Sequence, residues 1–241
     1  MKFLVISDMH GNVENLDRLD DVFKTVDGVL CAGDYAEFNK LETAKPVLEK
    51  LVSKHESIFS VIGNCDDPEF IGEVENQDAS VHKTLVFHEG FAIAGSSGGS
   101  VFTNTTPNER EEADLLTDFQ IVENSTESCA DENGKWSNLI LISHNPPKTE
   151  KCDSPCEGVH AGSQMLTDFI KEKAPILVVT GHIHEGAAIE KIDNSTVINP
   201  GPLAEGKYAL VDFEKKNGEW VLTNAELCKK KKKKTVLNNH D

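Results

Sequence analysis

Short apolar runs alternate with longer amphipathic segments over the first sixty residues of the chain. The runs at 2–7, 28–31 and 58–62 have the length and composition of buried strands. The segments between them, 12–24 and 41–54, carry apolar residues at helical spacing. Strand, helix, strand, helix and strand in this order predict a parallel sheet with right-handed crossover connections.

From residue 81 onward the pattern indicates more antiparallel pairing. The apolar runs at 85–87 and 91–94 flank a short turn, His88-Glu89-Gly90, which predicts a hairpin. Helices are predicted at 107–120 and 163–173, and further strands at 139–142, 176–180, 187–192, 196–198, 208–213 and 220–223. The polar segment 121–137 is predicted to be a mobile loop. Together these elements predict a mixed α/β sandwich in which two β-rich layers are covered by helices.

Charge is divided unevenly between the body of the chain and its end. The net charge is −17, which argues against a nucleic-acid surface. Residues 229–241 hold six lysines and one aspartate, a charge of +5, so residues 1–228 carry −22. With no repeat or linker visible, we expect one domain at 1–228 and a solvated, disordered tail at 229–241, a membrane or RNA tether being the alternative for that tail.

Neither a membrane segment nor a disulfide framework is predicted. No apolar stretch approaches the roughly 20 residues that span a bilayer, and Asp8 interrupts the apolar N-terminus, so we expect a cytoplasmic protein. Six cysteines in this length do not form a disulfide pattern. Cys31 is expected to be a buried free thiol, and Cys152-Asp-Ser-Pro-Cys156 is expected to be a loop rather than a zinc site.

Side chains able to bind metals follow five of the predicted strands. In chain order they are Asp8 and His10, then Asp34, then Asn64, Cys65 and Asp66, then His144, and last His182 and His184. Ligands collect at the carboxyl ends of strands in open α/β sheets, so we expect these side chains at one sheet edge. Singly, Asp34 would be a turn residue and Asn64 a cap, but five such segments in this order favour a shared site.

The chemistry of this group favours divalent transition metals. Two carboxylates, one amide oxygen and four imidazoles suit Mn, Fe or Zn rather than Ca. Seven side chains exceed one tetrahedral site but fit two adjacent sites that share a carboxylate. Two metals about 3.5–4 Å apart can activate water and bind a phosphoryl oxygen at the same time.

The motif set Asp8-x-His10, Gly33-Asp34, Gly63-Asn64-x-Asp66, His144 and Gly181-His182-x-His184 resembles the calcineurin-like metallophosphoesterase family over residues 1 to about 214. The resemblance implies a four-layer α/β/β/α sandwich with mixed sheets. It also implies a dinuclear site in which Asp8, His10 and His184 bind one metal, Asn64, His144 and His182 bind the other, and Asp34 bridges them. Manganese is favoured over Fe, Zn, Ni or Co, and the substrate is expected to be a small phosphate ester attacked by metal-bound hydroxide.

Cys65 departs from the common pattern of that family. Many members carry a histidine here, which protonates the leaving group or holds the phosphate. A thiol is a weaker donor and carries no charge, so the resemblance implies a Gly-Asn-Cys-Asp branch that favours diesters with activated leaving groups. A packed, inert thiol is an equally compatible interpretation. A nucleophilic cysteine is disfavoured, because no phosphate-cradling loop with an arginine follows it.

These interpretations leave several functions and residues open. We expect a phosphodiesterase with Asn64, Cys65, Asp66 and His144 in catalysis, while a phosphomonoesterase, a nucleotide hydrolase and a non-catalytic protein-binding scaffold are the alternatives. Formation of a homo-oligomer is left open. The acidic helix predicted at 107–120 and the segment 121–137 are candidates for a lid over the site or for a subunit contact. Of the remaining polar residues, Asn12 is predicted to be an N-cap and His55, His82 and His88 to be surface residues. His160 is predicted to be a helix-start residue, with contact to the substrate as the alternative.

Overall fold

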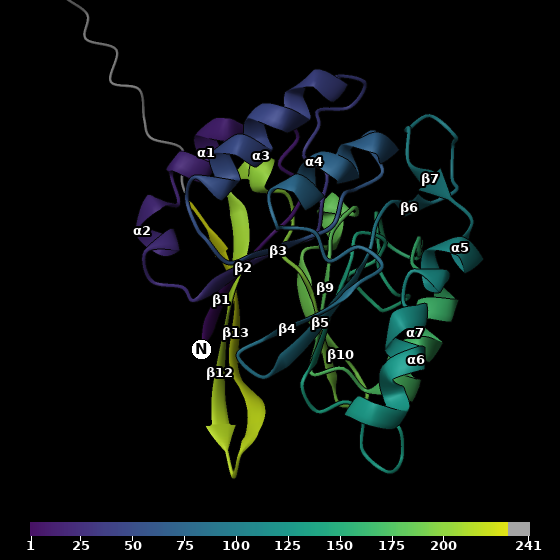
Figure 1. Ribbon diagram of the computed structural model, residues 1–241. Coiled ribbons are helices and arrows are strands. Elements are labelled where there is room, and N and C mark those ends of the chain that lie inside the picture. The colour runs from purple at the N-terminus through teal and green to yellow at the C-terminus, as the bar shows by residue number, and fades with distance from the viewer. Residues whose placement is uncertain (231–241) are drawn as a thin grey trace, which may run out of the picture.

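Two large mixed sheets form the centre of the protein in the computed structural model, which describes residues 1–230 (Figure 1). The first sheet has the strand order β13-β12-β1-β2-β3, and the second has the order β10-β11-β9-β8-β5-β4. The strands of the first sheet are β1 (Lys2–Ile6), β2 (Gly28–Cys31), β3 (Ile58–Ser60), β12 (Lys207–Lys216) and β13 (Glu219–Lys229). Those of the second are β4 (Leu85–His88), β5 (Phe91–Ser96), β8 (Leu139–Ser143), β9 (Leu177–Thr180), β10 (Ala188–Ile192) and β11 (Ser195–Asn199).

Parallel pairing occupies the middle of both sheets. Strands β1, β2 and β3 are mutually parallel, as are β5, β8, β9 and β11. Antiparallel pairs close the edges, with β12 and β13 beside β1, and β4 and β10 beside β5 and β11. The β4–β5 hairpin forms where it was predicted. The predicted mixed α/β class is therefore confirmed.

Helices cover the outer faces of both sheets (Figure 1). On the side of the first sheet lie α1 (Val13–Asp17), α2 (Asp20–Phe23), α3 (Ala44–Val52) and α4 (Ile71–Asn76), and on the side of the second lie α5 (Glu112–Thr117), α6 (Gln120–Cys129) and α7 (Gln164–Lys173). Single turns of 3₁₀ helix occur at η1 (Leu41–Thr43), η2 (Pro68–Phe70), η3 (His184–Gly186) and η4 (Leu203–Glu205). A small parallel pair, β6 (Gly99–Ser100) and β7 (Glu109–Arg110), lies beside α5.

Alternation of side chains along each strand produces separate apolar cores. Leu4 and Ile6 of β1 point into a core shared with α1 and α3, whereas Phe3 and Val5 point into the core between the two sheets. A third core lies between the second sheet and α6 and α7, where Phe169 stacks on Phe119. Because the buried strands carry apolar residues on both faces, they read in the sequence as continuous apolar runs.

Three expectations about secondary structure need correction. The predicted helix at 12–24 is two short helices, α1 and α2, although Asn12 caps α1 as expected by accepting a hydrogen bond from the Asn15 amide (3.0 Å). The predicted helix at 107–120 is shorter, because Glu109 and Arg110 form β7. The predicted mobile loop at 121–137 is wrong, since most of it is helix α6.

Helix α6 escaped prediction because few of its residues are apolar. Its burial rests mainly on Val122, which packs into the third core with Phe119 and Trp136. Trp136 is 1% exposed, so this segment is anchored at both ends by aromatic or aliphatic contacts. Tertiary packing here outweighs a local pattern that favours a loop.

The C-terminal hairpin extends into the lysine run. Lys229, the first lysine of that run, is the last residue of β13 and pairs with Lys207, one residue past the predicted boundary of the domain. Lys230 still donates its amide to the carbonyl of Gly206 (2.9 Å). The remainder of the predicted tail lies outside the described residues. Within residues 1–230, no helix is long and apolar enough to cross a membrane.

His82, predicted at the surface, is largely buried, with a side chain 15% exposed. Its Nδ1 atom lies 3.5 Å from an Asp118 oxygen, and Lys83 and Arg110 form ion pairs with the same carboxylate. Burial lowers the pKa of His82 to about 4, in spite of the opposing effect of Asp118. The folded protein therefore resists protonation of this imidazole.

Protonation of His82 is expected to make the protein less stable in mild acid. Below about pH 6.5 the unfolded chain binds a proton at His82 that the folded chain does not bind until about pH 4, so the free energy of unfolding falls over this window. Between pH 7.5 and pH 5 the loss should be about 2 kcal/mol. Urea denaturation of wild type and His82→Gln at both pH values measures it, and parallel pH dependences in the two proteins would contradict this assignment.

Candidate metal centre

The predicted ligands come from the carboxyl ends of strands in two sheets. Asp8, Asp34 and Asn64 follow β1, β2 and β3 of the first sheet, while His144 and His182 follow β8 and β9 of the second. The expectation of one sheet edge is therefore incomplete, because the site lies where the ends of both sheets meet. This arrangement lets side chains approach a common centre from two directions.

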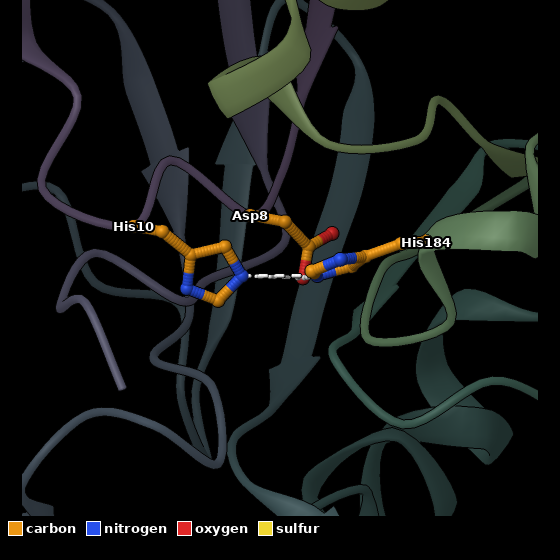
Figure 2. A group of neighbouring side chains, drawn as sticks. All are labelled: Asp8, His10 and His184. Carbon is orange, nitrogen blue, oxygen red and sulfur yellow. Dashed lines mark hydrogen bonds and ion pairs between the residues drawn. The ribbon is translucent and has the colours of Figure 1, made fainter. Parts of the chain in front are cut away.

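Asp8, His10 and His184 form one group of converging ligand atoms (Figure 2). The Nε2 atoms of His10 and His184 are 3.0 Å apart, and each faces the Asp8 carboxylate, at 3.9 Å and 3.6 Å from Oδ1 respectively. Two imidazole nitrogens and one carboxylate oxygen directed at the same point are a ligand set typical of divalent transition metals.

Asp34 stands between that group and a second one. One carboxylate oxygen, Oδ2, lies 3.8 Å from His10 Nε2, and the other, Oδ1, lies 3.5 Å from His144 Nε2. His144 Nε2 is in turn 2.8 Å from Asn64 Oδ1. The two oxygens of one carboxylate thus face imidazoles from different sheets.

His182 completes the set of seven. Its amide donates to Asp8 Oδ1 (3.1 Å), and its ring centroid lies 5.3 Å from that of His144. All seven side chains predicted to bind metal are therefore brought together, in two groups joined by Asp34.

Hydrogen bonds behind the imidazoles determine which ring nitrogens face the centre. His144 Nδ1 donates to the carbonyl oxygen of Ala32 (2.6 Å), and His10 Nδ1 donates to that of Ala36 (3.0 Å). A donating Nδ1–H leaves the lone pair on Nε2, which is the atom directed at the carboxylates. The loop that carries Asp34 thus also orients the two histidines on either side of it.

The backbone is left-handed at four of the ligands. Asp8, His10, Asp34 and His182 have φ values of 54°, 44°, 55° and 68°, in a region that is uncommon for residues other than glycine. Each costs about 1–3 kcal/mol and persists only where the surroundings enforce it. Here the amides of Met9 and His10 both donate to the carbonyl of Asp34 (2.8 and 3.0 Å), which ties the first ligand loop to the second.

Two glycines of the motifs are required because side chains of neighbouring loops lie directly against their Cα atoms. A Cβ on Gly63 would overlap the Asp34 carboxylate, and a Cβ on Gly181 would overlap the Ser7 hydroxyl. The glycines that precede Asn64 and His182 therefore let the ligand loops pack directly against each other.

The electrostatics of the site suit a bound cation. Burial would raise the pKa of Asp8, but the His184 hydrogen bond and the neighbouring imidazoles bring it below its usual range. Burial lowers the pKa of His144, and burial and His144 lower that of His182 to about 4. Asp8 is therefore ionised at neutral pH beside neutral His144 and His182 rings, while the hydrogen bond to Asp8 raises the pKa of His184.

A buried oxygen without a partner provides a test of whether metals fit. Asp8 Oδ2 is inaccessible to solvent and accepts no hydrogen bond within the described residues. An unsatisfied buried acceptor costs about 1–3 kcal/mol, more for a charged group, and a cation would satisfy it. With imidazole nitrogens and carboxylate oxygens converging in these groups, the residues present fit divalent metals.

Comparison with known proteins agrees with this chemistry. A family model described as calcineurin-like phosphoesterase matches residues 1–186. This chain belongs to the calcineurin-like phosphoesterases. The family uses divalent metals, for which this phosphoesterase has candidate ligand groups.

Individual relatives extend the likeness over nearly the whole chain. An uncharacterised protein of Methanocaldococcus jannaschii is 29% identical over 222 residues, which cover 89% of this chain and 93% of that protein. A solved structure from Thermus thermophilus is similar with a TM-score of 0.69 and 20% identity, over 88% of this chain and 93% of that one. A calcineurin-like phosphoesterase of Bacillus subtilis has a TM-score of 0.51 and 14% identity, over 95% and 89% of the two chains. At these identities the two structures show a shared fold.

Asp66 of this phosphoesterase lies behind the ligands rather than among them. Its side chain is buried and accepts hydrogen bonds from the amides of Tyr35 (3.2 Å), Ala36 (2.7 Å) and Gly63 (2.8 Å). Burial and the charge of Asp34 raise its pKa to about 6, although the three amides oppose the shift. Asp66 thereby joins the loop after β2 to the loop after β3 and positions Asp34.

Cys65 lies at the centre, beside the bridging carboxylate. Its amide donates to Asp34 Oδ1 (2.8 Å), and its Sγ atom forms a group with His10 and Asp34 whose ligand atoms lie within 4.8 Å of one another. Burial and the Asp34 carboxylate raise the pKa of the thiol. A protonated thiol is a poor nucleophile, which agrees with the interpretation that Cys65 is not a covalent catalyst.

Other residues singled out in the sequence lie apart from these ligand groups. His160 bonds to Asp153 (3.0 Å) in an exposed loop, and the cap of helix α7 is Ser163, so the helix-start interpretation of His160 is wrong. Residues 151–156 lie outside the helices and strands, which confirms the predicted loop, with Cys152 buried and Cys156 exposed. Cys31 is also buried and free, as predicted.

Sequence reasoning missed residues that position the ligands by hydrogen bonds. Asn199 donates to the carbonyls of Cys152 (3.1 Å) and Ile183 (2.8 Å) and so fixes the loop that carries His182 and His184. The only feature of the sequence that pointed to Asn199 was its position directly after the predicted strand at 196–198 and before Pro200-Gly201. Thr106 receives a hydrogen bond from Asn64 Nδ2 (3.1 Å), and nothing in the sequence near Thr106 indicated this contact.

Proposed function

We propose that this phosphoesterase is a dinuclear-metal-dependent phosphodiesterase that cleaves a P–O bond of a small phosphate ester. The observation that carries the proposal is the position of Asp34, whose two oxygens face His10 on one side and His144 on the other. One carboxylate between two ligand groups is the arrangement needed to bridge two ions.

Seven side chains would hold the two ions. Asp8, His10 and His184 would bind the first, Asn64, His144 and His182 the second, and Asp34 both. Two adjacent divalent ions, manganese in our proposal, would lower the pKa of bound water and neutralise the charge of the phosphoryl group. The chain itself supplies orientation, since backbone carbonyls hold His10 and His144 and backbone amides hold Asp66.

The surroundings of the site bear on its substrate. Residues 1–228 carry a charge of −22, and neither of the two arginines is free to bind an anion. Arg18 bonds to Asn15 (2.7 Å) and pairs with Glu14, while Arg110 forms a two-point ion pair with Asp118 (2.6 and 2.8 Å). The arginines therefore add no positive charge for a monoester dianion, which favours diesters with their single charge.

The need to protonate the leaving group also favours diesters. Cys65 occupies the centre as a neutral thiol, which is a weak proton donor to an alkoxide. A diester with a good leaving group needs no such proton. Phosphodiesters with activated leaving groups are therefore the proposed substrate class. This function is favoured over that of a phosphomonoesterase, a nucleotide hydrolase or a protein-binding scaffold.

A substrate panel tests the proposal. Metal-free protein supplied with Mn²⁺ is assayed on bis(p-nitrophenyl) phosphate, p-nitrophenyl phosphate and cyclic AMP. We expect turnover of the aryl diester at least about tenfold above that of the monoester, which corresponds to 1.4 kcal/mol in the barrier. A preference for the monoester, or no turnover of any ester with any divalent metal, would overturn it.

A further inference from the structure

The loop between β6 and β7 begins and ends at the metal centre. Gly99, in β6, lies so close that a Cβ there would be 3.1 Å from Asn64 Cβ and 3.5 Å from His182 Cε1. At the other end, Thr106 accepts a hydrogen bond from the Asn64 side chain (3.1 Å), and the Asn108 amide donates to the Asn64 carbonyl (3.1 Å). Residues 101–106 therefore project from the rim of the site, with both ends held at Asn64.

A single carboxylate holds this loop in one conformation. Glu109 accepts hydrogen bonds from five successive backbone amides, those of residues 102–106, at 2.7–3.1 Å. Partial burial opposes ionisation, but these amides lower the pKa of Glu109 to about 2, so the carboxylate is charged at neutral pH. Successive amides converging on an anion form a nest, and here the anion is part of the chain.

The most exposed large apolar side chain of the described residues lies on this loop. Phe102 is 88% exposed, and its neighbour Val101 is 41% exposed. Burial of a phenylalanine contributes about 1.5–3 kcal/mol, so folding gains little from a ring left in water. The ring lies on a loop whose ends are held at the metal centre and whose conformation is fixed by seven hydrogen bonds to Glu109, which favours a partner that arrives with the substrate.

We propose that Phe102 is a specificity-determining residue that packs against an aromatic organic group of the phosphate ester. The inference rests on the proposed function, because it takes the phosphorus to be bound at the metal centre. Two aromatic rings in contact gain about 0.5–1.5 kcal/mol beyond the area they bury. Such a contact supplies affinity that the acidic surface of this protein cannot supply to an anion. Glu109 is the corresponding positioning residue.

Binding of two phosphonates separates this inference from catalysis. Calorimetry on Mn²⁺-loaded protein measures the affinity for phenylphosphonate and for methylphosphonate, which differ only in the organic group. We expect wild type to prefer the phenyl compound and Phe102→Ala to reduce that preference roughly tenfold. Phe102→Tyr should retain it. Phe87→Ala is the matched control, since Phe87 is 61% exposed on β4, outside the loop, and should not change the preference.

Each outcome bears on one proposal or the other. An unchanged preference in Phe102→Ala, or a wild type that binds neither phosphonate, would overturn the inference. Protein that hydrolyses no ester, yet shows a phenyl preference dependent on Phe102, would overturn the proposed function alone.

The role of Glu109 is tested by a double-mutant cycle. If Glu109 acts by holding Phe102 in place, Glu109→Ala should reduce the phenyl preference as Phe102→Ala does, and the double variant should lose no more than either single one. Glu109→Gln keeps one acceptor oxygen and should retain part of the preference. Additive losses would show that Glu109 does not act through Phe102.

Discussion

Asp34→Asn is expected to lower phosphodiester turnover by more than about a hundredfold and to reduce the metal bound per chain. Replacing even a residue that only orients a metal ligand typically costs about 10–100-fold, and in the proposed site Asp34 would itself contact both ions. An amide has one oxygen where the carboxylate has two. The variant therefore loses one of the two oxygens that face His10 and His144 in wild type.

The fold of this variant should survive. Burial and the charge of Asp8 raise the pKa of Asp34, so the neutral amide removes an unfavourable buried charge. Its oxygen can still accept the Cys65 amide, which bonds Asp34 Oδ1 (2.8 Å) in wild type. Elemental analysis, turnover and thermal unfolding would be measured together. Asp67→Asn is the matched control, because the half-buried Asp67 carboxylate only caps η2. Its loss should leave turnover within about twofold, a small part of a 1.4 kcal/mol change. Full turnover of chelator-treated Asp34→Asn would defeat the two-metal proposal.

Cys65→His is expected to raise the ratio of monoester to diester turnover by about tenfold or more. The imidazole would add a proton donor and partial positive charge beside Asp34, both of which an alkoxide leaving group and a dianion need. General acid catalysis contributes about 10²–10⁴-fold where it operates, so a tenfold change is a low threshold. The ratio is measured with an alkyl monoester, glycerol 2-phosphate, whose alkoxide leaving group needs a proton, and with bis(p-nitrophenyl) phosphate under the same Mn²⁺ load.

Cys65→Ala serves as the comparison for that experiment. Because a nitrophenolate departs without a proton, this variant should lose little activity on the aryl diester. A wild type that already prefers monoesters, or a ratio that does not rise in Cys65→His, would show that the thiol does not set the substrate class.

Much of the sheet architecture was accessible from apolar runs alone. Strands such as β8 and β9 are buried on both faces, so each appears as an uninterrupted apolar stretch followed by its ligand. The same reasoning failed for α6, where one buried valine and a distant tryptophan anchor a polar helix. Local pattern carries no information about a contact partner fourteen residues away.

The ligand residues were predictable in kind but not in geometry. Their position after apolar runs identified them, yet it suggested one sheet edge, whereas the ends of two sheets meet at the site. The left-handed backbone at Asp8, His10 and Asp34 could not be foreseen, because none of these is glycine and the strain is maintained by contacts between loops. The same holds for Asn199 and Glu109, whose partners are backbone groups that any sequence would provide.

Metal titration tests the central claim most directly. Metal-free protein would receive Mn²⁺ in known equivalents while hydrolysis of bis(p-nitrophenyl) phosphate and the heat of binding are followed. With Asp34 between two ligand groups, activity should rise until two equivalents per chain are bound and then stay constant. Full activity in metal-free protein, or a plateau at one equivalent, would contradict it.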